Sequence, residues 1–152
     1  MHFNFGYPLL DEGSRIVYRG KVRPRKGCEE WFTKRNFKIA PAPTARHSGA
    51  GEDVAFIDPQ PDRQGLCHVG VVNRKLGLGV EIAYLKSHFP VLVNWQHFGM
   101  NEYVLGLEPL SGGMEGHGKE LMLSPGERRE YTCSLRVLTE KRSLKELVDR
   151  FG

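Results

Sequence analysis

The sequence predicts an all-β fold, an antiparallel β-sandwich that ends in a short helix. Apolar residues mostly recur at every second position, which is the period of a half-buried strand. Clusters of Pro, Gly, Asn and Asp separate these runs at residues 58–62, 73–77 and 124–127. Many short strands joined by turns indicate a sandwich rather than βαβ units. At 152 residues, the chain fits a single domain spanning residues 1–152.

Seven segments are expected to form strands after the N-terminal region. They are residues 15–22, 53–57, 65–73, 78–85, 91–95, 102–109 and 129–138. In the last of these, Tyr131, Cys133, Leu135 and Val137 share one face, while Thr132, Ser134 and Arg136 share the other. This alternation predicts a half-buried strand.

Three segments interrupt the period of two. Residues 40–51 are rich in Pro, Ala and Gly and predict a long surface loop. Residues 111–118 are too glycine-rich for a strand and predict a second loop directly after Glu108. The tail predicts a helix over residues 143–151, because Ser143 can cap it with Glu146 as its capping-box partner and an apolar stripe follows at Leu144, Leu147, Val148 and Phe151.

Composition and spacing exclude several classes of function. The net charge of +4 is spread over the chain without the aromatic interleaving of a nucleic-acid module, so no nucleic-acid partner is expected. No apolar run is long enough to span a bilayer, and no signal peptide opens the chain. The three cysteines form neither a disulfide framework nor a CxxC pair, which fits a reducing cytoplasmic location. The histidines lack metal-ligand spacing, so neither a metal nor a cofactor is expected.

Two polar residues stand out against apolar surroundings. Glu108 closes the most apolar strand-like run, and the following Pro109 stops it, so its carboxylate is either a base in a cleft or an ordinary strand-end glutamate in solvent. His2 and Asn4 alternate with aromatic residues, which would put both side chains on one strand face beside rings. An N-terminal histidine can equally be exposed and frayed.

Five stretches, taken in order, carry a resemblance to a known superfamily. They are residues 2–13, 72–80, 89–96, 102–109 and 123–127. Together they resemble the later half of the aldose 1-epimerase-like (galactose mutarotase-like) proteins, in particular a DUF4432-type branch. The resemblance spans residues 2–138 and implies a truncated β-supersandwich with a sugar-binding cleft.

In mutarotases of that fold, a glutamate removes the proton of the anomeric hydroxyl and a histidine protonates the ring oxygen. The resemblance places these catalytic roles on Glu108 and His2. It further implies substrate binding by Asn4, Trp95 and Gln96, with Trp95 either a platform for the sugar ring or a core residue. These residue types suit acid/base chemistry, because burial can raise the pKa of a carboxyl group and a histidine titrates near neutral pH.

The sequence also departs from the family pattern. First-half strands and their substrate contacts have no counterpart, Ile57 stands where relatives often carry histidine, and residues 110–112 replace a more polar segment. Two hypotheses follow: an aldose 1-epimerase-like isomerase acting on a hexose or modified sugar, or a non-catalytic carbohydrate-binding or regulatory sandwich. Open sheet edges further predict self-association or pairing with a second chain.

Overall fold

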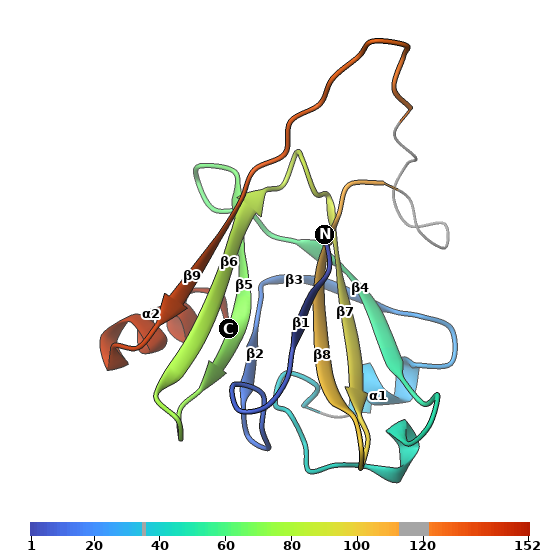
Figure 1. The fold of residues 1–152 in the computed structure, drawn as a ribbon, viewed down its shortest axis with the longest axis vertical. Helices are drawn as coiled ribbons and strands as arrows, with labels where there is room; N and C mark the ends of the chain where they lie inside the picture. Colours follow the sequence, from blue (N-terminus) through green and yellow to red (C-terminus); the bar gives the residue numbers. More distant parts are fainter. Residues whose placement is uncertain (35, 113–121) are drawn as a thin grey trace.

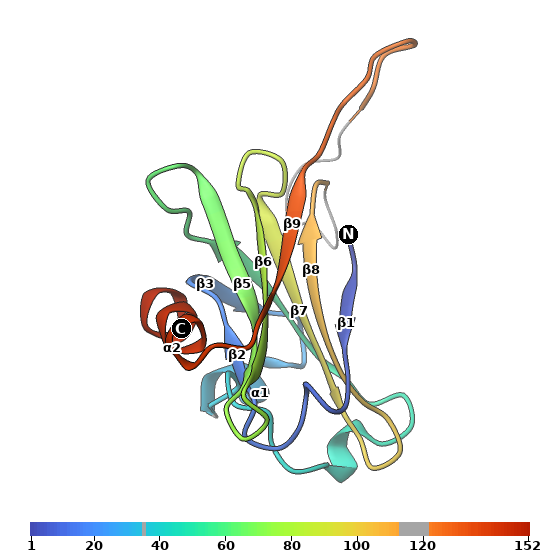
Figure 2. The same ribbon diagram turned by 60° about the vertical axis from the view of Figure 1, so that its left-hand side comes forward.

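The computed structural model describes residues 1–34, 36–112 and 122–152, and it has two antiparallel sheets packed face to face (Figure 1). The five-stranded sheet has the order β1-β8-β7-β4-β3, and the four-stranded sheet has the order β2-β5-β6-β9. The helix α2 covers the outer face of the four-stranded sheet, as the turned view in Figure 2 shows. The predicted antiparallel sandwich with a C-terminal helix is therefore confirmed.

The strands are short and regular. They are β1 (Phe3–Phe5), β2 (Arg15–Val17), β3 (Gly20–Pro24), β4 (Asp53–Pro59), β5 (Leu66–Asn73), β6 (Leu78–Leu85), β7 (Val91–Phe98), β8 (Tyr103–Leu110) and β9 (Cys133–Leu138). The helices are α1 (Glu29–Lys34), the 3-10 turn η1 (Ala45–His47) and α2 (Lys141–Phe151).

The core lies between the two sheets. Alternate residues of each strand point into it, among them Leu92 and Phe98 of β7 and Leu105 and Leu107 of β8, all of which are fully buried. The intervening residues of these strands lie on the outer face of the five-stranded sheet. A second, smaller apolar cluster of Val54, Phe56, Val91 and Val93 forms there, with Trp95 and Leu110 packed against it.

The helix α2 is amphipathic and closes the second sheet. Its apolar stripe of Leu144, Leu147, Val148 and Phe151 packs on Val17, Val72 and Leu138. The helix begins at Lys141 with Glu140 as the N-cap residue, and Glu140 makes no side-chain capping bond. The stripe was predicted correctly, but the predicted cap at Ser143 is wrong because the helix starts before that residue.

The bounds of the other elements differ in part from those predicted. The run 78–85 has its predicted bounds, whereas 15–22 is two strands that belong to different sheets. The helix α1 was not predicted, and β9 begins only at Cys133. That strand is largely exposed rather than half-buried. Most of the loop predicted at 111–118 lies outside the described residues.

A buried histidine holds the predicted loop at 40–51 against the five-stranded sheet. The Nδ1 atom of His47 accepts a hydrogen bond from the backbone N–H of Phe98 at 2.8 Å, so Nε2 carries the proton. That Nε2 lies 2.7 Å from Asp53 Oδ2, and Arg46 binds the same carboxylate through Nε at 2.6 Å. Both His47 and Asp53 are fully buried, so this network helps to fix the loop against the sheet.

A second histidine links the four-stranded sheet to α2. The ring of His68 stacks on Phe151 with centroids 4.2 Å apart. Its Nδ1 lies 2.8 Å from Glu81 Oε1 and its Nε2 lies 3.1 Å from Asp62 Oδ2. Because carboxylates accept, both nitrogens must donate, which requires the imidazolium form. The hydrogen bond to Glu81 accordingly raises the pKa of His68.

This arrangement predicts how stability depends on pH. A histidine with a raised folded-state pKa stabilises the fold fully below its ordinary pKa of 6.5, and the effect is lost as pH rises through the higher folded value. His68→Gln should therefore lower the free energy of unfolding more at about pH 6 than at about pH 9. Urea unfolding of both proteins at the two pH values measures this, with other titrating groups cancelling in the difference. An equal loss at both pH values would contradict the assignment.

Candidate functional site

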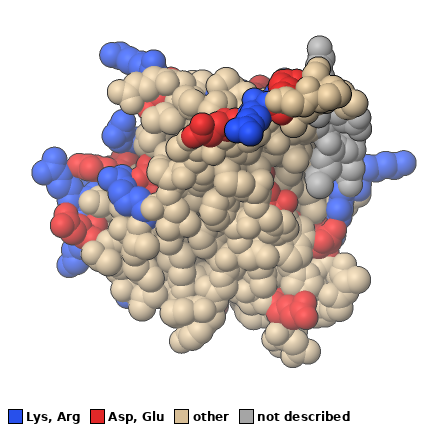
Figure 3. Space-filling model, turned by 45° about the horizontal axis from the view of Figure 1, so that its top comes forward, with Lys and Arg blue, Asp and Glu red and all other residues tan. Residues whose placement is uncertain are grey.

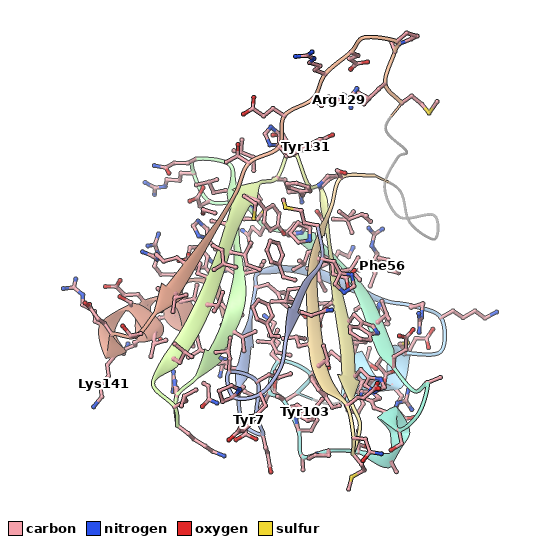
Figure 4. All side chains as sticks on the ribbon, viewed as in Figure 1. Tyr7, Phe56, Tyr103, Arg129, Tyr131 and Lys141 are labelled. Carbon is pink, nitrogen blue, oxygen red and sulfur yellow. The ribbon has the colours of Figure 1, made fainter. Side chains whose placement is uncertain are left out.

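The outer face of the five-stranded sheet carries a pocket of about 290 Å³, just below the roughly 300–1,000 Å³ typical of small-molecule sites. Val54 and Phe56 of β4 (Phe56 is labelled in Figure 4) and Val93 of β7 supply its apolar lining. The polar or aromatic lining comes from five residues: His2, Arg25, Glu52, Trp95 and Glu108. Apolar walls with a few converging polar groups are typical of a ligand site.

Glu108 and His2 form the centre of the pocket. The Nε2 atom of His2 lies 3.2 Å from Oε1 of Glu108, whose side chain is 14% exposed. Burial raises the pKa of Glu108, while the positive charges of His2 and of the N-terminal amine act in the opposite direction. The N-terminal amine also donates to the carbonyl oxygen of Pro109 at 2.8 Å. The chain start is thereby tied to β8, which positions His2 over the carboxylate.

The apolar groups that desolvate Glu108 come from neighbouring strands. Leu105 and Leu107 are close to Glu108 in the same strand, but their side chains point into the core on the other side of the sheet. Val93 pairs with Glu108 in the β7–β8 ladder and lies on the same outer face of the sheet as Glu108, and so does Trp95. The strand pairing therefore creates an environment that the local sequence does not contain.

A second carboxylate in the pocket has the opposite character. Glu52 accepts hydrogen bonds from Nε1 of Trp95 and lies 2.8 Å from Nη1 of Arg25. Burial opposes ionisation of Glu52, but these hydrogen bonds outweigh it and lower its pKa. The pocket therefore holds one carboxyl group that is kept ionised and one that is shifted toward neutral pH. Two carboxyl groups with pKa values shifted in opposite directions are typical of acid/base sites.

Trp95 connects the two carboxylates. Its ring meets that of His2 edge-on with centroids 6.2 Å apart, and it stacks on His97 at 6.0 Å. It is half-buried, so one side of the ring is available at the pocket. The hydrogen bond to Glu52 fixes its orientation. Trp95 thus lies at the pocket rather than in the core between the sheets.

A glycine makes this arrangement possible. Gly106 of β8 lies beside Trp95 of β7 in the ladder, and a Cβ atom there would be 2.6 Å from Glu108 Oε1. The same atom would lie 3.1 and 3.2 Å from atoms of Trp95. The missing side chain therefore leaves room for both the carboxylate and the indole.

The structure brings three of the five proposed site residues together: His2, Glu108 and Trp95. Asn4 lies on the exposed edge strand β1, opposite Gly106, and is not among the pocket residues. Gln96 is fully buried on the core side of β7, where it accepts from Nε1 of Trp31 at 2.7 Å and donates to the carbonyl of Phe37 at 2.9 Å. Its amide is therefore occupied away from the pocket.

Two pocket residues were not predicted from the sequence: Arg25 directly follows β3, and Glu52 directly precedes β4. Neither belongs to a motif, and only the pairing of these strands brings the two together. Within the described ranges, His, Cys, Asp and Glu side chains form no group of three or more that could hold a metal ion. None of the helices formed by those residues is long and apolar enough to cross a bilayer.

Comparison with known proteins gives one family and one fold match. The model of the family "Domain of unknown function (DUF4432)" matches residues 1–137. A crystal structure from Klebsiella pneumoniae, named a "putative aldose 1-epimerase", is similar in fold with a TM-score of 0.82 and 22% sequence identity. The match covers 98% of this chain and 40% of that one, so the chain spans less than half the length of that relative. The comparison with curated proteins gives no significant match.

The role of Gly106 can be tested by substitution. Gly106→Ala should force Glu108 and Trp95 to move, and overpacking of this kind lowers the free energy of unfolding by about 1–3 kcal/mol. Urea unfolding measures the loss, and the indole fluorescence should change because one of the two tryptophans is displaced. Gly6→Ala is the matched control, since its Cβ would meet only a backbone oxygen at 3.8 Å. Equal behaviour of the two variants would contradict the tight packing at Gly106.

Proposed function

The chain belongs to the DUF4432 family, and from its pocket and its fold we propose that it binds a sugar and interconverts the sugar's anomers by acid/base ring opening. The observation that carries the proposal is the contact between His2 and Glu108 beside the half-buried ring of Trp95. An aromatic face suits the apolar face of a pyranose, and a proton donor and acceptor at one point suit its anomeric centre. The fold match to a protein named a "putative aldose 1-epimerase" supports the same interpretation.

The proposed reaction needs one proton acceptor and one proton donor. Glu108 takes the proton from the anomeric hydroxyl as the C1 to ring-oxygen bond breaks, and His2 gives a proton to the ring oxygen. The open-chain aldehyde then rotates, and the reverse transfers close the ring on either face. The anomeric hydroxyl and the ring oxygen are bonded to the same carbon, so a donor and an acceptor 3.2 Å apart can serve both.

Arg25 and Glu52 have supporting roles in this proposal. Their ion pair lies at the same pocket and holds the indole of Trp95 through Glu52. Because Glu52 stays ionised, it can accept hydrogen bonds from sugar hydroxyl groups. The sugar is a hexose or a modified sugar of similar size, in keeping with the pocket volume.

Substitution of Glu108 tests the assignment. Glu108→Gln should abolish mutarotation but retain sugar binding, because the amide keeps the shape of the side chain and cannot accept the proton. His2→Ala should lower the rate by about 10²- to 10⁴-fold, the usual effect of losing a general acid. Polarimetry on freshly dissolved α-glucose and α-galactose measures turnover, and calorimetry measures binding.

Glu12→Gln, at an exposed glutamate outside the pocket, is the matched control and should leave both quantities unchanged. Turnover that survives Glu108→Gln would refute the catalytic role. Sugar binding without turnover in the unaltered protein would instead favour the non-catalytic carbohydrate-binding sandwich.

The raised pKa of Glu108 predicts the pH profile of turnover. The carboxyl group must be ionised to accept a proton, so kcat/KM should fall as pH decreases through its folded-state pKa. That pKa lies above the ordinary value of 4.5 because burial disfavours the charge. The acidic limb of the profile should therefore have its midpoint above 4.5. A midpoint at or below this value would contradict Glu108 as the base.

A further inference from the structure

The strand β9 is an edge strand with features that set it apart from the other edges of the sandwich. Among the residues that the structure describes, β6 is the one strand hydrogen-bonded to it. It runs for six residues in continuous register with β6, without a bulge. Its far side therefore presents a regular row of backbone N–H and C=O groups, which is a template for a further strand.

The other edge strands carry the usual protection against such pairing. β1 and β2 are only three residues long. The segment that follows α1 also covers β2, through a bridge between Arg15 and Ile39. β3 carries Lys21 and Arg23 and ends in Pro24. Short length, charge and proline all disfavour edge pairing, so among the described strands β9 is the edge with the least protection.

Two of the four exposed side chains of β9 are apolar. Leu135 and Val137 are 52% and 59% exposed, although they pair with Ile82 and Val80 on the core-facing side of the sheet. Tyr131, on the segment leading into β9 (Figure 4), is a further exposed aromatic residue at 38%. Apolar side chains that face the core side of a sheet and yet remain exposed are typical of an interaction surface.

Charge does not block an approach to this edge. The one charged residue of the strand, Arg136, is paired with Glu81, to which its Nε donates at 3.0 Å. Figure 3 shows a broad face almost free of Lys, Arg, Asp and Glu between the charged side chains on the left of the view and the grey segment on the right. The protein as a whole has a net charge of +4, so its charged side chains are unevenly distributed over the surface.

The sequence of β9 is self-complementary in one antiparallel register. With a two-fold axis at Leu135, that residue faces its own copy, Cys133 faces Val137 of the partner, and Ser134 faces Arg136 of the partner. The core-facing residues Cys133, Leu135 and Val137 then meet apolar side chains, the arginine meets a serine, and Leu138 faces Thr132 of the partner. Moving the axis to Arg136 would place two arginines opposite each other, which is unfavourable. A register shifted by one residue, which would put the two-fold axis between two residues of the strand, is excluded. It would place core-facing side chains opposite outward-facing ones.

We propose that β9 pairs with β9 of a second copy of this chain, joining two four-stranded sheets into one continuous eight-stranded sheet across a two-fold axis. The interface is isologous, so it closes at a dimer. It lies on the four-stranded sheet, whereas the pocket lies on the outer face of the five-stranded one. The proposal is therefore independent of the proposed sugar chemistry.

Light scattering coupled to size exclusion tests the assembly. The protein should have twice the mass of 17.2 kDa and dissociate on dilution. Leu135→Lys should weaken dimerisation at least tenfold, because it sets two lysines against each other at the axis. Leu76→Lys, at a residue 49% exposed in the β5–β6 turn, is the matched control and should remain dimeric. A monomer at all concentrations, an open-ended series of oligomers or a dimer insensitive to Leu135→Lys would overturn the proposal.

Disulfide trapping tests the register without relying on a destabilising variant. Val137→Cys should cross-link spontaneously to Cys133 of the partner under mild oxidation and give a dimer on non-reducing gels. Cys133 and residue 137 of the same chain are four strand positions apart, too far for a bond within one copy. The cross-link should disappear when Cys133→Ser is added. Failure to cross-link, or a cross-link that survives Cys133→Ser, would overturn the register.

Discussion

The antiparallel pairing of β7 with β8 is the constraint on which the rest of the structure depends. Eight residues of each strand pair in unbroken register, from Val91 with Leu110 to Phe98 with Tyr103. The buried side chains on the core face hold that register, because a slip by one residue would turn the apolar set outward. The same register puts Trp95 and Glu108 on the opposite face. The pocket is therefore a consequence of how the core packs.

Buried polar groups strengthen this constraint on the core side of the sheet. Gln96 links β7 to Trp31 of α1 and to the backbone at Phe37, and Asn94 donates to the hydroxyl of Tyr18 at 3.0 Å. A buried amide without partners would be costly, so these contacts fix the path of the chain between β2 and β4. That path carries Arg25 and, further on, Glu52 to the rim of the pocket. Polar contacts in the core thus help to assemble a site on the other face.

The sequence predicted the architecture well because alternation is a local signal. The runs at 78–85 and 91–95 identify β6 and β7 without any knowledge of their partners. The helix α1 was missed because its six residues are too few to show a helical period. Among the site residues, Trp95 and Gln96 are consecutive in one strand and so cannot both face the same pocket. Arg25 and Glu52 could not be predicted, since their meeting depends on pairing between distant strands. The exposure of β9 likewise depends on what the rest of the sandwich fails to cover.

One β-sheet separates the core from the pocket, and this has an evolutionary consequence. Along β7 the even-numbered residues face the core and are constrained by its packing, while the odd-numbered residues lie on the outer face that carries the pocket. Along β8 the odd-numbered residues face the core, and the even-numbered Gly106 and Glu108 lie on the pocket side of the sheet. Selection can therefore change the chemistry of the site at Val93 or Trp95 while the adjacent residues keep the sandwich intact. A family built on this sheet can change the lining of the pocket at one rate and conserve its fold at another.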